Sequence, residues 1–404
     1  MFKKGIMISA ALICAAAVLG SEAEAQGKGA PGVTDNSIRL CAYQPMTGAG
    51  SAYFLMGKGA DAWYKHVNEQ GGINGRKIDF QMVDDGFKAQ QAVVIARRFI
   101  ERDGCFAITN PLGTPQTTAV IDYVVEQKVP LVGAGTGAMK NVYFPSRYVF
   151  PLFPSYDIEA EDLFRFVKEE LKAKTVTILY QNDGSGKTHL AGAEPAAKKY
   201  GINILKTDGY EVKEVDVSAQ AIGLRSANPD VHICACQPEH GSRFLTERAK
   251  LGWKAPVLFW FVGQSPKLFE LAGKEAVEGV YFSSIFPQPS LDSKNPHIRE
   301  FTKIVQKYYP AENPDMVQMW GYAGAQVVTE AIRRMGRIPA DQFTREKFIE
   351  TLEGIKGWTG SIIPEVTINA YAKDASDHLL IRQMSWAQAK DGKFVDYHPV
   401  WTKK

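Results

Sequence analysis

The chain has 404 residues and nearly balanced charge, with 47 Lys and Arg against 44 Asp and Glu, a net charge of +3 and 45% hydrophobic residues. A near-neutral chain without a basic block or an acidic tail gives no reason to expect nucleic acid as a partner. Length divided by about 150 suggests two to three domains, and the hydrophobic fraction can fill two sizeable cores.

The first 25 residues have the pattern of a secretory signal peptide. Two lysines at positions 3 and 4 form the basic end, an apolar core covers Ile6 to Leu19, and Ala23-Glu24-Ala25 fits the cleavage site. The apolar run is shorter than the about 20 residues of a membrane span, which disfavours a retained anchor. We therefore expect a periplasmic protein of 404 − 25 = 379 residues without direct membrane insertion.

Four cysteines remain after this cleavage. Cys41 and Cys105 are the one pair for which we consider a disulfide, and whether it forms is left open. Cys234 and Cys236 would face the same side of a strand, where their Cα atoms lie too far apart for easy bridging. We predict that these two are buried free thiols.

Strands alternate with helices along most of the chain, which is typical of parallel sheets covered by helices. In the first half the predicted strands are Ile38–Tyr43, Ile78–Val83, Phe106–Ile108 and Val129–Val132, and the predicted helices are Ser51–Asn68, Ala89–Arg102 and one that begins at Thr114.

A second series of the same kind follows. The predicted strands are Thr175–Tyr180, Ile202–Thr207, Val231–Cys234, Val257–Trp260 and Gly279–Phe282, with helices near Glu159–Leu171, Lys187–Tyr200, Val217–Ser226 and Arg243–Leu251. Three late helices, His297–Tyr309, Val317–Arg334 and Arg345–Leu352, precede two terminal strands near Ile362–Ile368 and Leu379–Trp386. The fold class is thus α/β, with two doubly wound lobes, each with a parallel central sheet, joined by several chain crossings.

The turn after Phe106–Ile108 is the most informative stretch. Pro111 and Gly113 end the strand, Thr114 can act as N-cap, and Pro115 suits the first helical position. Free backbone N–H groups and hydroxyls at the positive end of a helix dipole favour a small anion such as a carboxylate. The alternative is that Thr114 only caps the helix.

Other chemistries find little support. Asp183-Gly184-Ser185-Gly186-Lys187-Thr188 resembles a phosphate loop, but Gln181 occupies the place of its first glycine. Gly48-x-Gly50 and Gly133-x-Gly135 lack the third glycine of a dinucleotide fingerprint. We find no Gly-x-Ser-x-Gly elbow and no His-Glu-x-x-His helix, and Cys234-Ala235-Cys236 with His240 is too tightly spaced for a usual zinc site. We expect no enzyme activity, no cofactor and no metal.

Several turns with hydroxyls or aromatic rings instead fall at carboxyl ends of predicted strands, where open α/β sheets bind ligands. A cleft between two lobes is the default site for a small molecule. The predicted ligand-binding residues are Thr47, Tyr53, Thr114, Ala134, Gly135, Thr136, Tyr156, Ser185, Gln237, Trp260, Phe261 and Gly263. For the run Phe259-Trp260-Phe261, the alternative is that the rings only build a strand core.

Four stretches also carry a family resemblance, and a fifth, Tyr148-Val149-Phe150-Pro151, resembles a first crossing between lobes. The four are Pro45-Met46-Thr47-Gly48, Asn68-Glu69-Gln70-Gly71-Gly72-Ile73-Asn74-Gly75-Arg76-Lys77, Asp84-Asp85 and Trp320-Gly321-Tyr322-Ala323-Gly324-Ala325-Gln326. Together they resemble leucine/isoleucine/valine-binding proteins, the type I periplasmic solute-binding components of ABC transporters. The resemblance covers nearly the whole mature chain and implies a membrane permease as partner. We expect the protein to be a monomer.

The resemblance also implies a division of the chain and of the site. Lobe 1 would comprise residues 36–150 plus 286–361, and lobe 2 residues 151–285 plus 362–404, with crossings near 150–155, 284–287 and 362–364. Thr114, and Ala134 with Thr136, would hold the ligand's carboxylate, and Tyr53 would cover the ligand. Ser185 stands where the family commonly has an aromatic residue.

One departure from the family pattern concerns the ligand. Amino-acid binders carry an acid just after the strand that matches Val257–Trp260, and Phe259-Trp260-Phe261-Val262-Gly263-Gln264 offers none. Burying an unpaired ammonium costs several kcal/mol. We therefore expect a small carboxylate with an apolar or aromatic body, with hydrophobic amino acids or amides as the alternative. A ligand-sensing receptor module is the alternative from another class.

Overall fold

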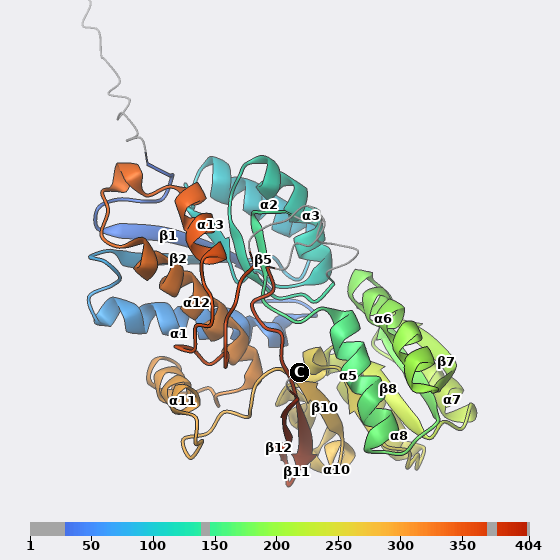
Figure 1. Cartoon of the computed structure of the whole chain (residues 1–404). Coiled ribbons are helices and arrows are strands. Elements are labelled where there is room, and N and C mark those ends of the chain that lie inside the picture. The colour runs from blue at the N-terminus through green and yellow to red at the C-terminus, as the bar shows by residue number, and fades with distance from the viewer. Residues whose placement is uncertain (1–28, 139–145, 370–377, 402–404) are drawn as a thin grey trace, which may run out of the picture.

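The computed structural model describes residues 29–138, 146–369 and 378–401, and it forms two lobes (Figure 1). The predicted signal peptide lies outside the described residues. Each lobe is built around one sheet, and helices cover both of its faces. The strand-and-helix alternation of the sequence thus produces the predicted α/β fold with two doubly wound lobes.

The amino-terminal lobe contains a five-stranded sheet in the order β2-β1-β3-β4-β5, with all neighbours parallel. Its strands are β1 (Ser37–Gln44), β2 (Lys77–Asp84), β3 (Ala107–Thr109), β4 (Leu131–Ala134) and β5 (Val149–Pro151). Its helices are η1 (Ser51–Phe54), α1 (Leu55–Glu69), α2 (Ala89–Glu101), α3 (Thr114–Glu126), α11 (Pro296–Tyr308), α12 (Met316–Met335), η3 (Ala340–Gln342) and α13 (Arg345–Glu353). Helix α1 packs on α12, and α2 packs on α3.

The carboxy-terminal lobe contains a seven-stranded sheet in the order β12-β11-β10-β9-β8-β6-β7. Its strands are β6 (Thr175–Gln181), β7 (Asn203–Tyr210), β8 (Val231–Ala235), β9 (Val257–Phe259), β10 (Tyr281–Ser284), β11 (Met384–Lys390) and β12 (Lys393–Trp401). Its helices are α5 (Tyr156–Glu169), α6 (Gly184–Tyr200), α7 (Ser218–Ser226), α8 (Pro238–Lys250), η2 (Phe261–Gly263), α9 (Lys267–Ala272) and α10 (Lys274–Val277). Strands β6 to β10 are parallel, and β11 and β12 are antiparallel additions at the edge.

The last strands differ from the prediction. Residues 362–368 form no strand, because Pro364 interrupts the run and only Val366 pairs, with Trp358. The next strand starts at Met384 rather than Leu379, and β12 was not predicted at all. Its signal was present as Asp391-Gly392, a hairpin turn in which both residues have positive φ, 54° and 73°.

Three chain segments lie between the lobes near Pro151. The chain passes from β5 into α5, and from β10 toward α11. In the third segment, the N–H groups of Leu380 and Ile381 donate to the carbonyls of Pro151 and Leu152, at 3.0 and 3.1 Å. Multiple crossings side by side are typical of a hinge. The predicted lobe boundaries themselves stay a prediction.

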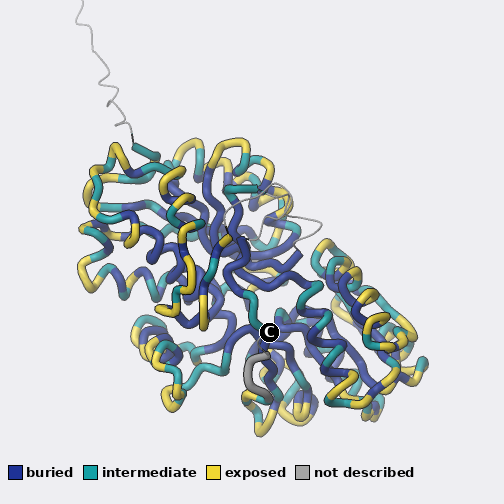
Figure 2. The backbone as a smooth tube through the Cα atoms, in the orientation of Figure 1, coloured by how far each residue is buried: buried dark blue, intermediate teal, exposed yellow. Residues whose placement is uncertain are grey.

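The hydrophobic core continues from one lobe into the other. Its largest cluster joins residues of α1 and α12 to residues of α5, α6 and the second sheet. Two smaller clusters lie under α2 and α3 and under α7 and α8. Figure 2 shows the buried strands inside each lobe and the exposed residues on the outer turns and helices.

Both remaining cysteine pairs are joined as disulfides. Cys41 in β1 is bonded to Cys105, with Cα atoms 6.0 Å apart. Cys234 is bonded to Cys236, so the prediction of free thiols was wrong. Cys236 lies beyond the end of β8, and the chain turns there, so the two Cα atoms are 5.2 Å apart rather than the about 6.7 Å of an extended strand.

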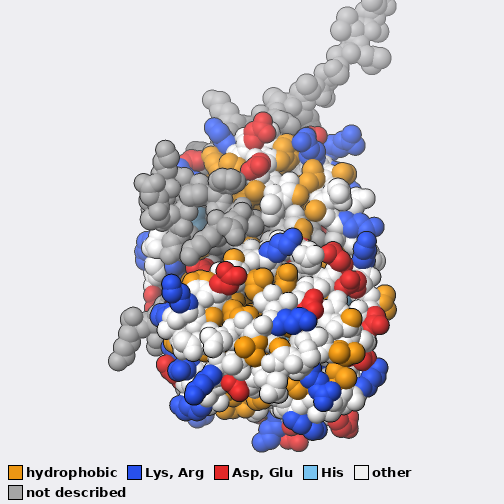
Figure 3. Space-filling model, turned by 90° about the vertical axis from the view of Figure 1, so that its right-hand side faces the viewer, with side chains coloured by type: hydrophobic (Ala, Val, Ile, Leu, Met, Phe, Trp, Pro, Cys, Tyr) orange, Lys and Arg blue, Asp and Glu red, His pale blue; other side chains and the backbone are white. Residues whose placement is uncertain are grey.

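The visible surface carries mixed charge. On the face in Figure 3, Lys and Arg side chains are interspersed with Asp and Glu, and hydrophobic side chains lie between them. Within the described ranges, no helix is long and apolar enough to cross a bilayer.

Candidate functional site

The candidate site lies between the lobes, where the strand order of each sheet reverses direction. In the first sheet β1 lies between β2 and β3, and in the second β6 lies between β7 and β8. Ligands of open α/β sheets bind at the carboxyl ends of strands at such switch points. The pocket has an empty volume of about 470 Å³, partly open to solvent, and is lined by Tyr53, Phe87, Leu112, Gly113, Thr114, Pro115, Gly135, Phe153, Tyr156, Gln181, Ser185, His189, Ala235, Cys236, Gln237, Val262 and Trp320.

The start of helix α3 forms one wall of the pocket. The N-cap is Gly113 and not Thr114 as predicted, because the turn needs a φ of 106°, which a glycine adopts readily. A Cβ atom on Gly113 would lie 2.1 Å from Oε1 of Gln116. No side chain caps this helix end, so the N–H of Thr114 lacks a helix partner and can bind an anion. Pro115 has no N–H, and the N–H of Gly113 donates to the carbonyl of Gly135 at 3.3 Å.

Thr114 is the first residue of α3 and adds a hydroxyl beside its own N–H group. Its Oγ1 lies 2.7 Å from Oγ1 of Thr136, which also accepts a hydrogen bond from the N–H of Ala138 at 3.2 Å. If Thr136 donates its proton to Thr114, the Thr114 hydroxyl is free to donate to a ligand. Thr136 therefore orients Thr114 from behind and does not line the pocket.

The backbone N–H groups of the turn after β4 already have hydrogen-bond partners inside the protein. The Gly135 N–H donates to the carbonyl of Pro111 at 2.8 Å, and the Thr136 N–H donates to that of Ala134 at 3.0 Å. Gly135 lines the pocket, whereas Ala134 and Thr136 are buried behind it. At this side of the pocket the N–H of Thr114 is thus free to bind a ligand, whereas those of Gly135 and Thr136 are not.

Aromatic rings from both lobes and the hinge form the apolar walls. Tyr53 comes from η1, Phe153 and Tyr156 from the hinge and the start of α5, and Trp320 from α12. The ring centroids of Phe153 and Trp320 lie 4.8 Å apart, and Tyr53 lies 6.3 Å from Phe87. The Tyr53 hydroxyl donates to the carbonyl of Val262 at 2.8 Å, which joins the two lobes across the pocket.

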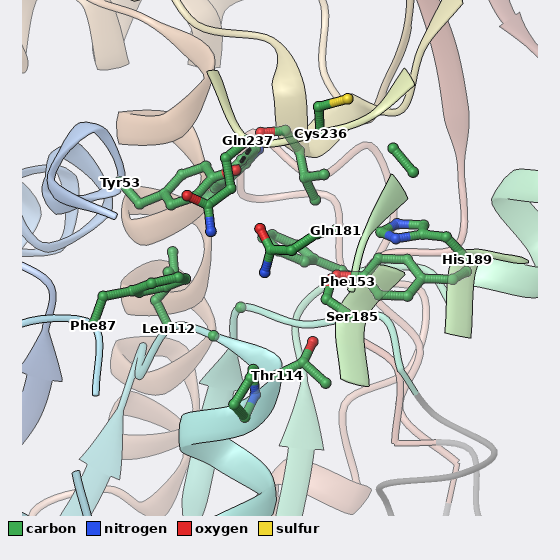
Figure 4. Close-up of a pocket in the computed structure, with 17 residues that line it drawn as sticks. Tyr53, Phe87, Leu112, Thr114, Phe153, Gln181, Ser185, His189, Cys236 and Gln237 are labelled. Atoms are coloured by element: carbon green, nitrogen blue, oxygen red, sulfur yellow. Dashed lines mark hydrogen bonds between the residues drawn. The ribbon is translucent and has the colours of Figure 1, made fainter. Parts of the chain in front are cut away.

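The opposite wall comes from the turns after β6 and β8. Figure 4 shows Gln237 at the top of the pocket and Thr114 at the bottom, with Gln181 and Ser185 between them. Asp183 caps helix α6 by accepting the N–H groups of Ser185 and Gly186, at 2.8 and 3.2 Å. The amides of α6 are therefore taken up by an acid of the protein, in contrast to those of α3.

Charged side chains do not reach the pocket: among its described lining residues there is no Asp, Glu, Lys or Arg. Glu159 lies behind the wall, where it accepts the N–H of Phe261 at 2.8 Å and the hydroxyl of Ser283. Burial raises the pKa of Glu159 to about 8. Burial lowers the pKa of His189, whose Nε2 lies 3.9 Å from Oε2 of Glu159, to about 3. Both groups are thus neutral at pH 7.

Six of the twelve predicted site residues line the pocket, namely Tyr53, Thr114, Gly135, Tyr156, Ser185 and Gln237. Thr47 lies elsewhere and donates its hydroxyl to Asp84 at 2.6 Å. Trp260 and Phe261 are fully buried and pack behind Tyr156, so they do not form the aromatic wall expected of them. Gly263 gives room to the ring of Phe259, which a Cβ atom would approach to 2.5 Å.

Sequence reasoning missed several lining residues. Phe87, Phe153 and Trp320 add apolar surface. Trp320 stood in a stretch that carried the family resemblance and Phe153 in the predicted crossing at 150–155, but neither was named as a site residue, and Phe87 stood in no such stretch. No group of three or more His, Cys, Asp or Glu residues suited to a metal ion occurs in the described part of the chain.

The periplasmic binding protein family model matches residues 37–393. The chain belongs to this family. The Leu/Ile/Val-binding protein homolog 8 of Brucella abortus is 20% identical over 352 residues, which are 85% of each chain. The resemblance to leucine/isoleucine/valine-binding proteins is thereby confirmed.

Solved structures of this periplasmic binding protein family share the fold. A fatty acid ABC transporter substrate-binding protein from Thermomonospora curvata has a TM-score of 0.82 and 22% identity, and covers 94% of this chain and 95% of its own. A leucine-binding protein from Thermotoga maritima has a TM-score of 0.78 and 21% identity, with 90% of this chain and 98% of its own covered. At these identities the similarity establishes the two-lobed fold alone.

Proposed function

We propose that this protein captures a small carboxylate with an apolar or aromatic body between its lobes and delivers it to the permease of an ABC transporter. The carboxylate docks on the uncapped start of α3 and the Thr114 hydroxyl. The rings of Tyr53, Phe153 and Trp320 enclose the ligand body. The second lobe then closes about the hinge and excludes water. The protein acts by binding alone, as an exported component without catalysis.

One observation carries this proposal: Thr114, whose N–H lies at the uncapped start of α3, lines a pocket that has no Asp, Glu, Lys or Arg among its described lining residues. A carboxylate held by such donors forms charge-assisted hydrogen bonds without a cationic side chain. An α-amino group would need a carboxylate of the protein, and Asp183 is already engaged as the cap of α6. Burying an ammonium without such a partner costs several kcal/mol.

Hydrophobic amino acids are the second candidate, because the curated relatives are named for leucine, isoleucine and valine. The structural relative from Thermomonospora is named for fatty acids, which are carboxylates without an amino group. The ligands in these names differ in the amino group, which amino acids have and fatty acids lack. The pocket lining has no carboxylate to pair with that group.

A thermal-shift screen tests the proposal. The mature protein is heated with members of five classes: amino acids, aromatic acids, short-chain aliphatic acids, amides and urea. A ligand present at 100 times its Kd stabilises the fold by about 2.7 kcal/mol, which raises the melting temperature measurably. We expect shifts with the acids. Shifts confined to amino acids would contradict the proposal.

Loss of uptake of the identified acid in cells without this protein would then support delivery to a permease.

A further inference from the structure

The buried amide of Gln237 has no partner inside the protein. Gln237 is 4% exposed and lines the pocket. Neither its Oε1 nor its Nε2 has a hydrogen-bond partner among the described residues. A buried carboxamide left without hydrogen bonds costs about 1–3 kcal/mol. Such a group therefore indicates a partner that the protein itself does not contain.

The backbone around Gln237 is held in place. Its N–H donates to the hydroxyl of Tyr210 at 2.9 Å, and that hydroxyl donates to Oε1 of Gln181 at 3.3 Å. The Nε2 of Gln181 donates to Asp183. These bonds fix the orientation of Gln181 and give each end of its amide a partner inside the protein, whereas neither end of the Gln237 amide has one.

The side chain of Gln237 does not cap the helix that it precedes. Gln237 is the N-cap residue of α8, in extended conformation before Pro238, and its side chain makes no capping bond. Figure 4 shows the side chain directed into the pocket from the side opposite to Thr114. A ligand whose carboxylate binds at Thr114 would thus present its far end to Gln237.

We infer that the ligand carries a hydroxyl group at the end opposite to its carboxylate, and that Gln237 selects for this group. A carboxamide offers one acceptor and two donors. A ligand hydroxyl can donate to Oε1 and accept from Nε2 at once, which satisfies both atoms. The ligand class is therefore a hydroxylated monocarboxylate with an apolar or aromatic body. This inference rests on the proposed function, because the carboxylate at Thr114 determines which end faces Gln237.

The test uses two matched pairs of acids in isothermal titration calorimetry with the mature protein. One pair is rigid, benzoate and 4-hydroxybenzoate, and the other is flexible, hexanoate and 6-hydroxyhexanoate. A site built around a hydroxyl rejects the analogue that lacks it, since the amide is then left unpaired. In at least one pair the hydroxy acid should bind more tightly by about tenfold or more.

The variant Gln237→Met removes the amide and keeps the length of the side chain. For this variant the preference within the pair should fall to about twofold or less, and the acid without the hydroxyl should bind at least as well as it does to the wild type. Unchanged discrimination in the variant would overturn the role of Gln237. The wild-type comparison remains decisive if the variant does not fold.

The two proposals fail in different ways. Equal binding of hydroxylated and plain acids by the wild type would overturn the inference and leave the proposed function intact, as expected if water satisfies the amide. Binding of none of the four acids, with tight binding of amino acids, would overturn both.

Discussion

Thr114 is the residue at which the proposed carboxylate site is most directly tested. Its hydroxyl lies against that of Thr136, and the residue lines the pocket at the uncapped start of α3. Replacing Thr114 by Val removes a hydrogen bond to a charged ligand group, which contributes about 1.5–3 kcal/mol. We expect the affinity for the ligand to fall by about tenfold or more.

The matched control for this prediction is Thr118→Val. Thr118 lies one turn further along α3, is exposed, and donates its hydroxyl to the carbonyl of Thr114 at 2.7 Å. Calorimetry should show unchanged affinity for this variant. Equal losses in the two variants would indicate an effect on helix α3 rather than on ligand contact.

The buried pair of Glu159 and His189 makes stability depend on pH. The folded protein keeps the Glu159 proton up to a pKa of about 8, whereas the unfolded chain releases it at the ordinary pKa of 4.5. The contribution of Glu159 to the free energy of unfolding is therefore complete below pH 4.5 and is lost as the pH rises through 8. His189 acts in the opposite sense: its contribution is present above pH 6.5 and is lost as pH falls toward 3.

Of these two residues, only Glu159 makes a contribution to stability that still changes with pH above pH 6.5, so an experiment between pH 7 and 8 isolates it from that of His189. Between pH 7 and 8 the Glu159 proton should change stability by up to about 1.4 kcal/mol per pH unit. Glu159→Gln keeps an acceptor for Phe261 but carries no titrating proton. Urea unfolding at the two pH values should show a smaller loss of stability on raising the pH for this variant than for the wild type. An identical loss would contradict the raised pKa of Glu159.

At the residue scale, the sequence singled out pocket-lining residues where the signal is local, and their role in ligand binding stays a prediction. Thr114 and Gln237 follow strand ends, and that position alone was enough to select them. Phe153 and Trp320 are in contact because the hinge and α12 come together in space, and no spacing along the chain predicts this contact. The run Phe259-Trp260-Phe261 was misleading, because aromatic rings at a strand end serve a core as readily as a ligand.

At the scale of elements, close packing of α1 against α12 positions Trp320. A Cβ atom on Gly321 would lie 1.8 Å from the carbonyl oxygen of Met56, and one on Gly59 would lie 1.9 Å from that of Gln318. The two helices thus approach backbone to backbone at these glycines.

Gly321→Ala should force α1 and α12 apart. Overpacking of this kind costs about 1–3 kcal/mol, and more where backbone atoms are in the way. Because Trp320 precedes Gly321 and lines the pocket, ligand affinity should fall together with the melting temperature. Gly354→Ala, at the end of α13 with its nearest atoms 3.4 Å away, is the control and should change stability by less than about 0.5 kcal/mol. A Gly321 variant as stable as the wild type would show that the helices can separate freely.

The elements themselves were mostly predictable, and the failures have physical causes. Long periodic segments such as α2 and α12 were placed within one or two residues of their observed ends. The apolar run at 362–368 resembles a strand but packs beside α12, where the N–H of Ile362 donates to Gln326 at 3.0 Å. The disulfide between Cys234 and Cys236 depends on a turn at the end of β8, which strand geometry alone did not suggest.

At the scale of the whole molecule, the two lobes touch across the pocket. The hydrogen bond from Tyr53 to Val262 and the contact of Phe261 with Trp320, at 5.8 Å between centroids, both connect lobes. These contacts hold the lobes together in this structure, and a ligand that adds further contacts across the pocket would favour the same arrangement.

Tyr53→Phe should weaken this closure without removing the ring from the pocket. The lost hydrogen bond contributes about 0.5–1.5 kcal/mol, so ligand affinity should fall by about two- to tenfold. Small-angle X-ray scattering without ligand should give a larger radius of gyration than for the wild type. An unchanged radius and affinity would mean that this bond does not help to hold the lobes together.

The general architecture could be predicted because it follows from the alternation of strands and helices, repeated twice. Strand order could not be derived in this way, and the site depends on it: the same arrangement, with the first strand between the second and third, recurs in each sheet. This order brings the two switch points face to face, with the uncapped start of α3 on one side and Gln237 on the other.

The central claim is that the pocket accepts a carboxylate and has no carboxylate of its own to pair with an ammonium. The most direct measurement is calorimetric titration with leucine and with 4-methylpentanoate, which has the same carbon skeleton without the amino group. We predict that 4-methylpentanoate binds at least about 100-fold more tightly, because an ammonium would be buried unpaired. Tighter binding of leucine would contradict the claim.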